Sequence, residues 1–351
     1  MTIFDPTTDT HSRNKALVNK LRTALYDIDP ATLQDQLREV FSPDATIHLA
    51  YPFETLDGVD DLYETAYVPL LAAIPDLERR DFIFMAGPDD KGRNWVGCGG
   101  HYIGVFERHW LDIPPTQHMV AMRYHEFFHI VDDKIVEMQA LWDIPQVMMQ
   151  ADAWPLVPSL GVECQIIPAP ASNDGIITAP HDMDETTKSV KLVLDMVTDL
   201  KNSPPGYAAM RLEEYWHPKM NRYGPAGIGS VRRMSGFRLW HQMPFLKAMP
   251  DRGPIMENGA LFGDGDYVGF TAWPGMQMTY SGDGWLGIPP GNQQLTMRSL
   301  DFWRREDDLL RENWVLVDML SVYDQMGVDV FERMREVTVA RQPNPLGWDK
   351  W

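Results

Sequence analysis

Trp110-Leu111-Asp112-Ile113-Pro114-Pro115 reappears 175 residues later in the chain as Trp285-Leu286-Gly287-Ile288-Pro289-Pro290. At this fixed offset, 13 residues are identical between 110–143 and 285–318, including the aspartates that end the two stretches. Two unrelated stretches of this length and of ordinary composition would share roughly two residues. A single repeat this long indicates a duplicated domain, because the repeats of solenoid proteins are only about 20–50 residues long.

The chain of 351 residues has room for two domains, at roughly 150 residues per domain. Between the repeated stretches, residues 151–188 show neither a helical nor a strand period and contain Pro155, Pro158, Pro168, Pro170 and Pro180. Proline fixes φ and lacks an N–H donor, so this composition is typical of a linker. We therefore predict one domain at 1–150, a proline-rich linker at 151–188 and a second domain at 189–351.

Each domain is predicted to place helices before a meandering sheet, which indicates an α+β fold. In the first domain, apolar spacing and turn residues predict helices at 13–26, 31–40 and 58–73, and strands at 46–50, 78–86, 94–107, 118–130 and 134–143. In the second domain they predict helices at 187–200, 206–215 and 237–248, and strands at 254–262, 266–273, 293–305 and 309–318.

A set of short motifs occurs in the same order in both halves. The first half has Phe41-Ser42-Pro43-Asp44, Ile74-Pro75-Asp76, Ile113-Pro114-Pro115-Thr116 and the stretch 133–137; the second has Trp216-His217-Pro218, Met249-Pro250-Asp251, Ile288-Pro289-Pro290-Gly291, Glu312-Asn313-Trp314 and Gln325-Met326-Gly327. This order and spacing resemble those of the SnoaL-like polyketide cyclases, members of the nuclear-transport-factor-like superfamily. The resemblance implies two tandem cone-shaped domains, or α+β barrels, in which helices pack on a curved antiparallel or mixed sheet.

Asp143 and Asp318 are the candidate catalytic residues. Alternation along the last predicted strand of each domain puts them on one face with aliphatic and aromatic neighbours, where desolvation would raise the carboxyl pKa. The resemblance implies that such an aspartate removes a proton beside a carbonyl, without metal or cofactor, to drive an intramolecular aldol closure. The alternative is that each aspartate is only the N-cap of the helix that follows.

The preceding strand supplies possible partners for this base. Arg123, His125, Phe127 and His129 alternate along one face, and Arg298, Phe302 and Arg304 are among their equivalents. We predict catalytic roles for Arg298, His125 and His129, because a cation or histidine near the base could hold an enolate oxygen. Aromatic side chains could stack on a flat substrate, although such residues more often belong to the core. The predicted substrate-binding residues are Tyr102, Trp273, Arg123, Trp314 and Phe302.

His125-Glu126-Phe127-Phe128-His129 has the H-E-x-x-H spelling of zinc metalloproteases. That chemistry requires a helix, whereas this segment follows an alternating run and ends at a turn, which predicts a strand. Four strand residues separate the two histidines by roughly 13 Å, too far for both to bind one zinc ion at about 2.1 Å. We therefore predict no metal site, and the lack of a glycine-rich phosphate loop predicts no nucleotide cofactor.

Composition narrows the class of partner and the compartment. The formal net charge of −19 disfavours binding to nucleic acid or to anionic membrane surfaces. The N-terminus lacks the pattern of a secretory signal, no apolar run is long enough to span a bilayer, and the chain has 2 cysteines. A cytoplasmic location is expected.

The family resemblance and the two candidate aspartates predict a protein that acts on a hydrophobic carbonyl compound by cofactor-free acid–base chemistry, namely cyclisation, isomerisation or dehydration. A second hypothesis is a non-catalytic small-molecule binding or scaffold protein, since one fold hosts many functions. A third, less favoured, is an epoxide or ester hydrolase. Because related folds pair through their sheets, the chain is expected to be a monomeric pseudo-dimer or a homodimer.

Overall fold

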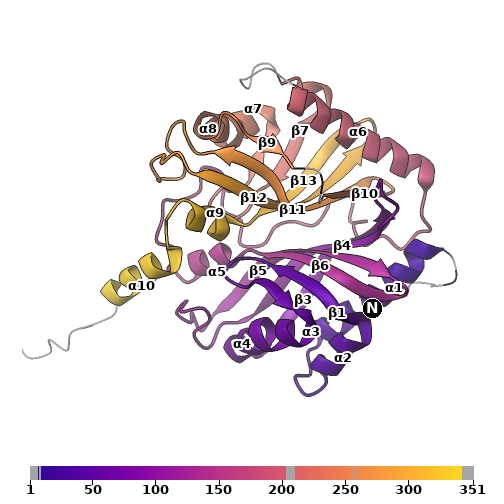
Figure 1. Cartoon of the computed structure of the whole chain (residues 1–351), viewed down its shortest axis with the longest axis horizontal. Helices are drawn as coiled ribbons and strands as arrows, with labels where there is room; N and C mark the ends of the chain where they lie inside the picture. The colour runs from indigo at the N-terminus through magenta and orange to yellow at the C-terminus, as the bar shows by residue number, and fades with distance from the viewer. Residues whose placement is uncertain (1–6, 8, 203–209, 256, 258, 342–351) are drawn as a thin grey trace, which may run out of the picture.

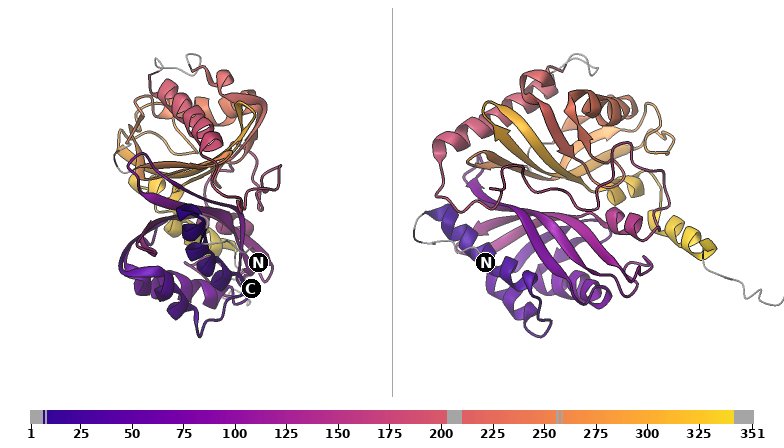
Figure 2. Two further views of the ribbon diagram at one scale, coloured as in Figure 1. Left: turned by 90° about the vertical axis from the view of Figure 1, so that its right-hand side faces the viewer. Right: turned by 180° about the vertical axis from the view of Figure 1, so that it is seen from behind.

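The computed structural model describes residues 7, 9–202, 210–255, 257 and 259–341. It contains two α+β domains, whose sheets lie side by side in the middle of the molecule while most helices cover the outer sides (Figures 1 and 2). No helix among the described residues is long and apolar enough to cross a membrane.

The N-terminal domain wraps its helices around one side of a six-stranded sheet. Its elements are α1 (Thr10–Tyr26), α2 (Leu33–Val40), β1 (Phe41–Leu49), β2 (Glu54–Asp57), α3 (Gly58–Asp61), the π-helical turn η1 (Leu62–Tyr67), α4 (Val68–Ala73), β3 (Glu78–Pro88), β4 (Asn94–Val105), β5 (Met119–Val131), β6 (Lys134–Trp142) and α5 (Ile144–Gln150). The strand order is β2-β1-β6-β5-β4-β3, and only β1 and β6 pair in parallel.

The C-terminal domain has the same strand order along its sheet, β8-β7-β13-β12-β11-β10, with β9 also paired to β11. Its elements are α6 (Met183–Asn202), the 3-10 turn η3 (Leu212–Glu214), β7 (Trp216–Tyr223), β8 (Val231–Arg232), α7 (Arg233–Phe237), the π-helical turn η4 (Arg238–Gln242), α8 (Met243–Ala248), β9 (Gly253–Pro254), β10 (Ala260–Asp264), β11 (Tyr267–Thr279), β12 (Gln294–Glu306), β13 (Leu309–Val317), α9 (Met319–Gln325) and α10 (Val330–Arg341). Here β7 pairs in parallel with β13, as β1 does with β6.

The α+β class and the mixed sheets are confirmed, whereas several details differ from the predictions. The two edge strands of each sheet do not pair with each other, so neither sheet is a closed barrel. The helix predicted at 206–215 falls partly outside the described residues, and its described part contains only η3 before β7 begins at Trp216. Strand β7 was missed because Pro218 interrupts its alternation, and its register with β13 shifts after Leu310.

The two sheets pack on each other through a shared apolar layer. The rings of Phe127 on β5 and Phe302 on β12 stack with their centroids 4.8 Å apart. These residues are 175 positions apart, so equivalent side chains from the two halves meet at the centre of the layer. The same layer includes Met85, Trp95, Leu141, Phe262, Leu300, Trp314 and Leu316. The sheets therefore pair inside the chain.

Residues 151–182 form no helix or named strand and run along the boundary between the domains. Isolated bridges tie Val162 to Ser230 and Ile176 to Phe84. Ile167 is buried in the layer between the sheets, and the Trp314 indole N–H donates to the carbonyl of Pro168 at 3.1 Å. Helix α6 begins at Met183, inside the stretch predicted as linker.

Candidate active site

The central strand of each sheet sends alternate side chains into two different buried layers. In β5, Tyr124 and Glu126 pair with Trp142 and Ala140 of β6, and they point toward the helices of their own domain. Arg123, His125 and Phe127 point toward the other domain. We call the layer between each sheet and its own helices the cone interior, and the layer between the sheets the domain interface.

Asp143 and Asp318 lie at the domain interface rather than in a cone interior. An oxygen of Asp143 accepts the N–H of Ala226 at 3.1 Å, and an oxygen of Asp318 accepts that of Tyr51 at 3.0 Å. Both acceptor contacts therefore cross to the opposite domain. Each aspartate is also the N-cap residue of a short helix, α5 or α9.

Arginines neutralise both interface carboxylates. Asp143 lies 3.5 Å from Arg123, and Asp318 lies 3.1 Å from Arg298. Burial raises the pKa of each aspartate, and the neighbouring arginine opposes that shift. The geometry gives both residues a structural role in joining the domains, and the Asp318 side chain also caps α9 by accepting the Ser321 N–H, while their catalytic role stays a prediction.

The predicted partners of these aspartates, Arg123 and His125, bind backbone carbonyls at the same interface. Arg123 donates to the carbonyls of Gly224 and Val315 at 2.8 and 3.0 Å. His125 Nδ1 lies 2.8 Å from the Leu300 carbonyl, and burial holds the pKa of its imidazole well below the usual value. The segment 125–129 is a strand, as predicted, and His129 stacks on Trp95.

Three of the predicted substrate-binding aromatics pack at the domain interface, and Tyr102 is the exception. Trp273 stacks on His48 with the ring centroids 5.6 Å apart, and the Arg298 guanidinium lies 4.6 Å from its ring. Phe302 and Trp314 belong to the apolar layer between the sheets. Of the predicted site residues, Tyr102 lies in a cone interior and the others lie at the domain interface, and their roles in substrate binding and catalysis stay predictions.

The N-terminal cone interior contains a buried polar cluster that the sequence analysis missed. Glu126, which is fully buried, accepts hydrogen bonds from the Tyr102 hydroxyl and the Trp142 indole, both at 3.1 Å, and from the Arg79 guanidinium. Arg79 also pairs with Asp81 at 3.0 Å. Burial lowers the pKa of Arg79, but Asp81 and Glu126 outweigh this effect and raise it.

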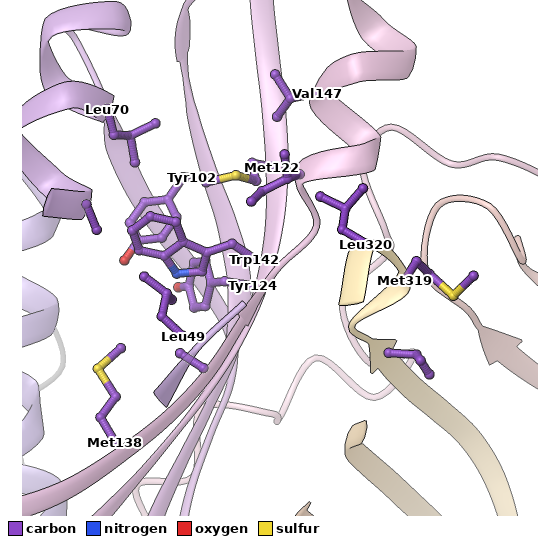
Figure 3. Close-up of a cluster of buried hydrophobic side chains, with 14 of the residues drawn as sticks. Leu49, Leu70, Tyr102, Met122, Tyr124, Met138, Trp142, Val147, Met319 and Leu320 are labelled. Atoms are coloured by element: carbon purple, nitrogen blue, oxygen red, sulfur yellow. The ribbon is translucent and has the colours of Figure 1, made fainter. Parts of the chain in front are cut away.

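Bulky side chains surround this cluster. Figure 3 shows Tyr102, Tyr124 and Trp142 side by side above the sheet, with Leu70 of α4 facing them. The Tyr102 ring lies 4.7 Å from that of Tyr124 and 5.6 Å from that of Trp142. Because its carboxylate is paired and its walls are packed aromatic rings, the N-terminal cone interior is filled by its own side chains.

Asp301 occupies the position in the C-terminal cone interior that Glu126 occupies in the first. It lies on β12, 175 residues after Glu126, and pairs with Val315 where Glu126 pairs with Ala140. The Ser299 hydroxyl donates to its carboxylate, and no arginine or lysine among the described residues forms an ion pair with it. Burial raises the pKa of Asp301 from 3.8 to about 6, despite the opposing effects of Ser299, Arg222 and Asn313.

Smaller residues stand around Asp301 where large ones stand around Glu126. Strand pairing makes Ser299–Val317 the equivalent of Tyr124–Trp142. Tyr102 pairs with Met122, and in the second sheet Met276 pairs with the equivalent Met297, so Met276 stands where Tyr102 does. Pro254 pairs with Met276 as Arg79 pairs with Tyr102, so Pro254 stands where Arg79 does. At these four positions the C-terminal cone interior therefore has neither the cation nor the aromatic rings that surround Glu126.

Polar atoms without a partner gather on the opposite wall of the C-terminal cone interior. Arg222 Nη1, His241 Nδ1 and Gln242 Oε1 are buried and have no hydrogen-bond partner among the described residues. Arg222 lies on β7, whereas His241 and Gln242 belong to η4. Burial lowers the pKa of Arg222 to about 10 and that of His241 well below its usual value. Unsatisfied buried polar groups are rare in folded proteins and identify a candidate ligand site.

Two surface depressions lie away from both buried carboxylates. One, of about 250 Å³, lies where α2, β1 and α3 meet and is lined by residues such as Arg38 and Asp60. The other, of about 270 Å³, lies between α6 and Tyr215. Among the residues that the structure describes, no group of three or more His, Cys, Asp or Glu side chains is arranged to hold a metal ion.

The sequence contained one signal that could have identified Asp301. At the 175-residue offset, Glu126 and Asp301 are both acidic, and each lies one residue before a Phe that the two halves share. These carboxylates have no predicted role, because the predicted catalytic residues lie on the alternate face of the strand. No comparable signal identified Arg222 or His241, whose equivalents in the first half are Ile47 and Ala66.

Each domain thus belongs to the class of small α+β domains that enclose a site between a curved sheet and helices, and each has a buried carboxylate in this cone interior. The family model described as SnoaL-like polyketide cyclase matches residues 19–151. By this match the N-terminal domain is similar to the SnoaL-like polyketide cyclases. A comparison with curated proteins finds no match.

Solved structures with similarity to this chain share little sequence with it. IdmH, a candidate polyketide cyclase from Streptomyces antibioticus, is 19% identical, with a TM-score of 0.34 over 40% of this chain and 99% of its own. A candidate SnoaL-like polyketide cyclase from Jannaschia sp. CCS1 is 20% identical, with a TM-score of 0.34 over 40% of this chain and 91% of its own. AclR, a candidate hydroxylase from Streptomyces galilaeus, is 20% identical, with a TM-score of 0.35 over 42% and 86%.

Proposed function

We propose that the C-terminal domain catalyses cofactor-free proton transfer on a hydrophobic carbonyl compound, with Asp301 as the acid–base residue. The observation that carries this proposal is the contrast between the two equivalent carboxylates. Glu126 is held by Arg79, Tyr102 and Trp142, whereas Asp301 has no ion-pair partner among the described residues and a pKa of about 6. A carboxylate with this pKa is suited to accept and return a proton near neutral pH.

The groups around Asp301 fit the removal of a proton from carbon. In such a step the carboxylate takes the proton beside the carbonyl, and negative charge develops on the carbonyl oxygen. A cation or a hydrogen-bond donor aimed at that oxygen lowers the barrier. Arg222 and His241, both with a buried nitrogen that lacks a partner, are the residues in this interior that can supply it. Return of the proton elsewhere gives isomerisation, and attack on a second carbonyl gives cyclisation.

We further infer that the two domains arose by tandem duplication, with the linker at 151–188 joining them, and that they have since diverged in function. The shared strand order and the repeated sequence support the duplication. The N-terminal domain, filled by its own aromatic rings, would then serve as a scaffold whose sheet covers that of the C-terminal domain. This assigns the scaffold hypothesis to one half and the acid–base hypothesis to the other.

Hydrogen–deuterium exchange tests the catalytic proposal without knowledge of the natural product. The full chain would be incubated in D2O with a panel of fused-ring aromatic ketones, and exchange beside the carbonyl followed by NMR. We expect the wild type to accelerate exchange on at least one member, and Asp301→Asn to lose about 100-fold or more of that acceleration.

Asp143→Asn and Asp318→Asn are the matched controls, since both remove a buried carboxylate from the domain interface. We expect these variants to retain exchange activity wherever they remain folded. Loss of exchange in Asp318→Asn but not in Asp301→Asn would transfer the catalytic role to the interface. Binding of a ketone without exchange in the wild type would favour the non-catalytic binding protein.

A further inference from the structure

We propose that the ligand of the C-terminal cone interior is an organic anion, with an apolar body and a carboxylate that pairs with Arg222. This inference rests on the proposed function, because it names the chemical class of substrate for the same site. Its starting point is a buried guanidinium that the protein leaves without an anionic partner.

Arg222 is 5% exposed and forms no ion pair within 4.0 Å with any described carboxylate. Asp301 lies near enough to interact electrostatically, but its carboxylate is bonded to Ser299 instead. The guanidinium lies over the Phe237 ring, and its carbon is 5.8 Å from the ring centroid. Burying an arginine without an anion is costly to stability, so its retention calls for a role.

The fold itself does not require an arginine at this position. Ile47 on β1 pairs with Met138 as Arg222 on β7 pairs with Asn313, and Ile47 is 0% exposed in the apolar core. The same replacement of an apolar residue by a cation occurs at Arg252, whose equivalent is the buried Leu77. Two apolar positions of the first domain have thus become cationic in the second.

These arginines leave the C-terminal cone interior with an excess of positive charge. Arg252 contacts the Met210 sulfur at 4.0 Å and has no ion pair among the described residues. Burial lowers the pKa of Arg252, and Asp301 is the carboxylate that acts on Arg222. The chain as a whole carries a net charge of −19, so this local excess runs against the general composition.

The remaining walls are suited to the apolar body of such a ligand. His241 lies between the rings of Phe237 and Phe245, with centroid distances of 5.3 and 5.8 Å. Phe245 in turn meets Trp285, and the buried side chains Met278 and Met297 belong to the same apolar cluster. Methionine side chains adapt readily to a flat ligand. The geometry points to an aromatic acid.

The test compares 2-naphthoate with 2-naphthamide, which have the same rings but differ in charge. Isothermal titration of the full chain at neutral pH would measure both affinities. We expect the wild type to bind naphthoate at least tenfold more tightly, because a guanidinium forms a paired, charge-assisted contact with a carboxylate and not with an amide. Arg222→Met should abolish this preference by weakening the binding of naphthoate at least tenfold.

Two further variants make the test specific. Arg232→Met removes an exposed arginine of β8 and should leave the preference for naphthoate unchanged. Asp301→Asn removes a negative charge near the bound carboxylate and should tighten the binding of naphthoate. Circular dichroism would establish that each variant is folded, and if Arg222→Met is not, Arg222→Lys keeps the charge, loses the paired contact and should reduce the preference severalfold.

The outcomes separate this inference from the proposed function. Equal binding of naphthoate and naphthamide, or a preference that survives Arg222→Met, would overturn the anion assignment and leave the acid–base site in place. Failure of both probes to bind the wild type would also overturn it. Exchange activity that depends on Asp301 is measured with neutral ketones, so it stands or falls independently.

Discussion

At the scale of single residues, Glu126 and Asp301 show how one position in a fold can acquire opposite energetics. Glu126 is part of a buried ion pair with Arg79, so its charge stabilises a cation that would otherwise be isolated. Asp301 is buried without such a partner, so the fold disfavours its charge and raises its pKa to about 6. The residue that costs stability is the one available for chemistry.

This contrast predicts opposite effects of two matched neutralising substitutions. Glu126→Gln should destabilise the protein by about 3–5 kcal/mol, because it leaves Arg79 with one buried partner fewer. Asp301→Asn should stabilise it at neutral pH. A carboxyl pKa raised from 3.8 in the unfolded chain to about 6 in the folded protein corresponds to a gain of about 3 kcal/mol on neutralisation.

The pH dependence fixes the sign of the second effect. Below pH 3.8 the carboxyl of Asp301 is protonated in both states and costs nothing. Between pH 3.8 and about 6 the unfolded chain ionises first, so the wild type loses stability relative to the Asn variant. Urea unfolding at several pH values should show the difference grow over this window and level off above it. A constant difference would contradict the assigned pKa.

At the scale of elements, the sequence predicted which residues share a face of a strand but not which layer that face enters. Arg123, His125, Phe127 and His129 do alternate together on β5. However, both faces of this strand are buried, one in the cone interior and one against the second domain. A strand covered on both sides lacks the polar face that would orient it. Asp143 and Asp318 lie on the face that joins the domains, and their catalytic role stays a prediction.

The helices and long strands were easier to predict, since their patterns are local. The helix predicted at 58–73 covers α3, η1 and α4, and the strands predicted at 118–130 and 134–143 match β5 and β6 to within one residue at each end. The C-terminal site was not predictable in this way. Its residues come from β7, η4 and β12, which are far apart in the sequence. The repeat identifies positions at which the two halves agree, whereas Arg222 and His241 lie at positions at which they differ.

The packing of β5 on β12 gives a prediction at this scale. Phe302 stacks on Phe127 and lies against the backbone of Gly97, where an added Cβ would be 2.8 Å from the Phe302 ring. Phe302→Ala should therefore destabilise the protein by about 3–5 kcal/mol, as buried aromatic truncations do. Val131→Ala, at the exposed end of β5, should change stability by less than about 0.5 kcal/mol. Comparable effects of the two substitutions in urea unfolding would contradict the sheet packing.

At the scale of the whole molecule, the position of the two sheets makes a prediction about assembly. Each sheet has one face covered by its own helices and the other by the sheet of the second domain, and residues 151–182 cover part of the boundary. The surface that would join two single-domain copies is thus already buried within one chain. Hydrogen bonds of Asp143 with Ala226 and of Asp318 with Tyr51 also join the two domains.

We therefore predict that the protein is a monomer in solution. Sedimentation velocity should give the mass of a single chain across a wide concentration range. Phe302→Asp places a charge at the centre of the interface, where burial without a partner is costly. That variant should expose the sheet faces and sediment as larger, concentration-dependent species, whereas Val131→Asp at an exposed position should remain a monomer. A stable wild-type dimer would mean that a surface outside the paired sheets mediates assembly.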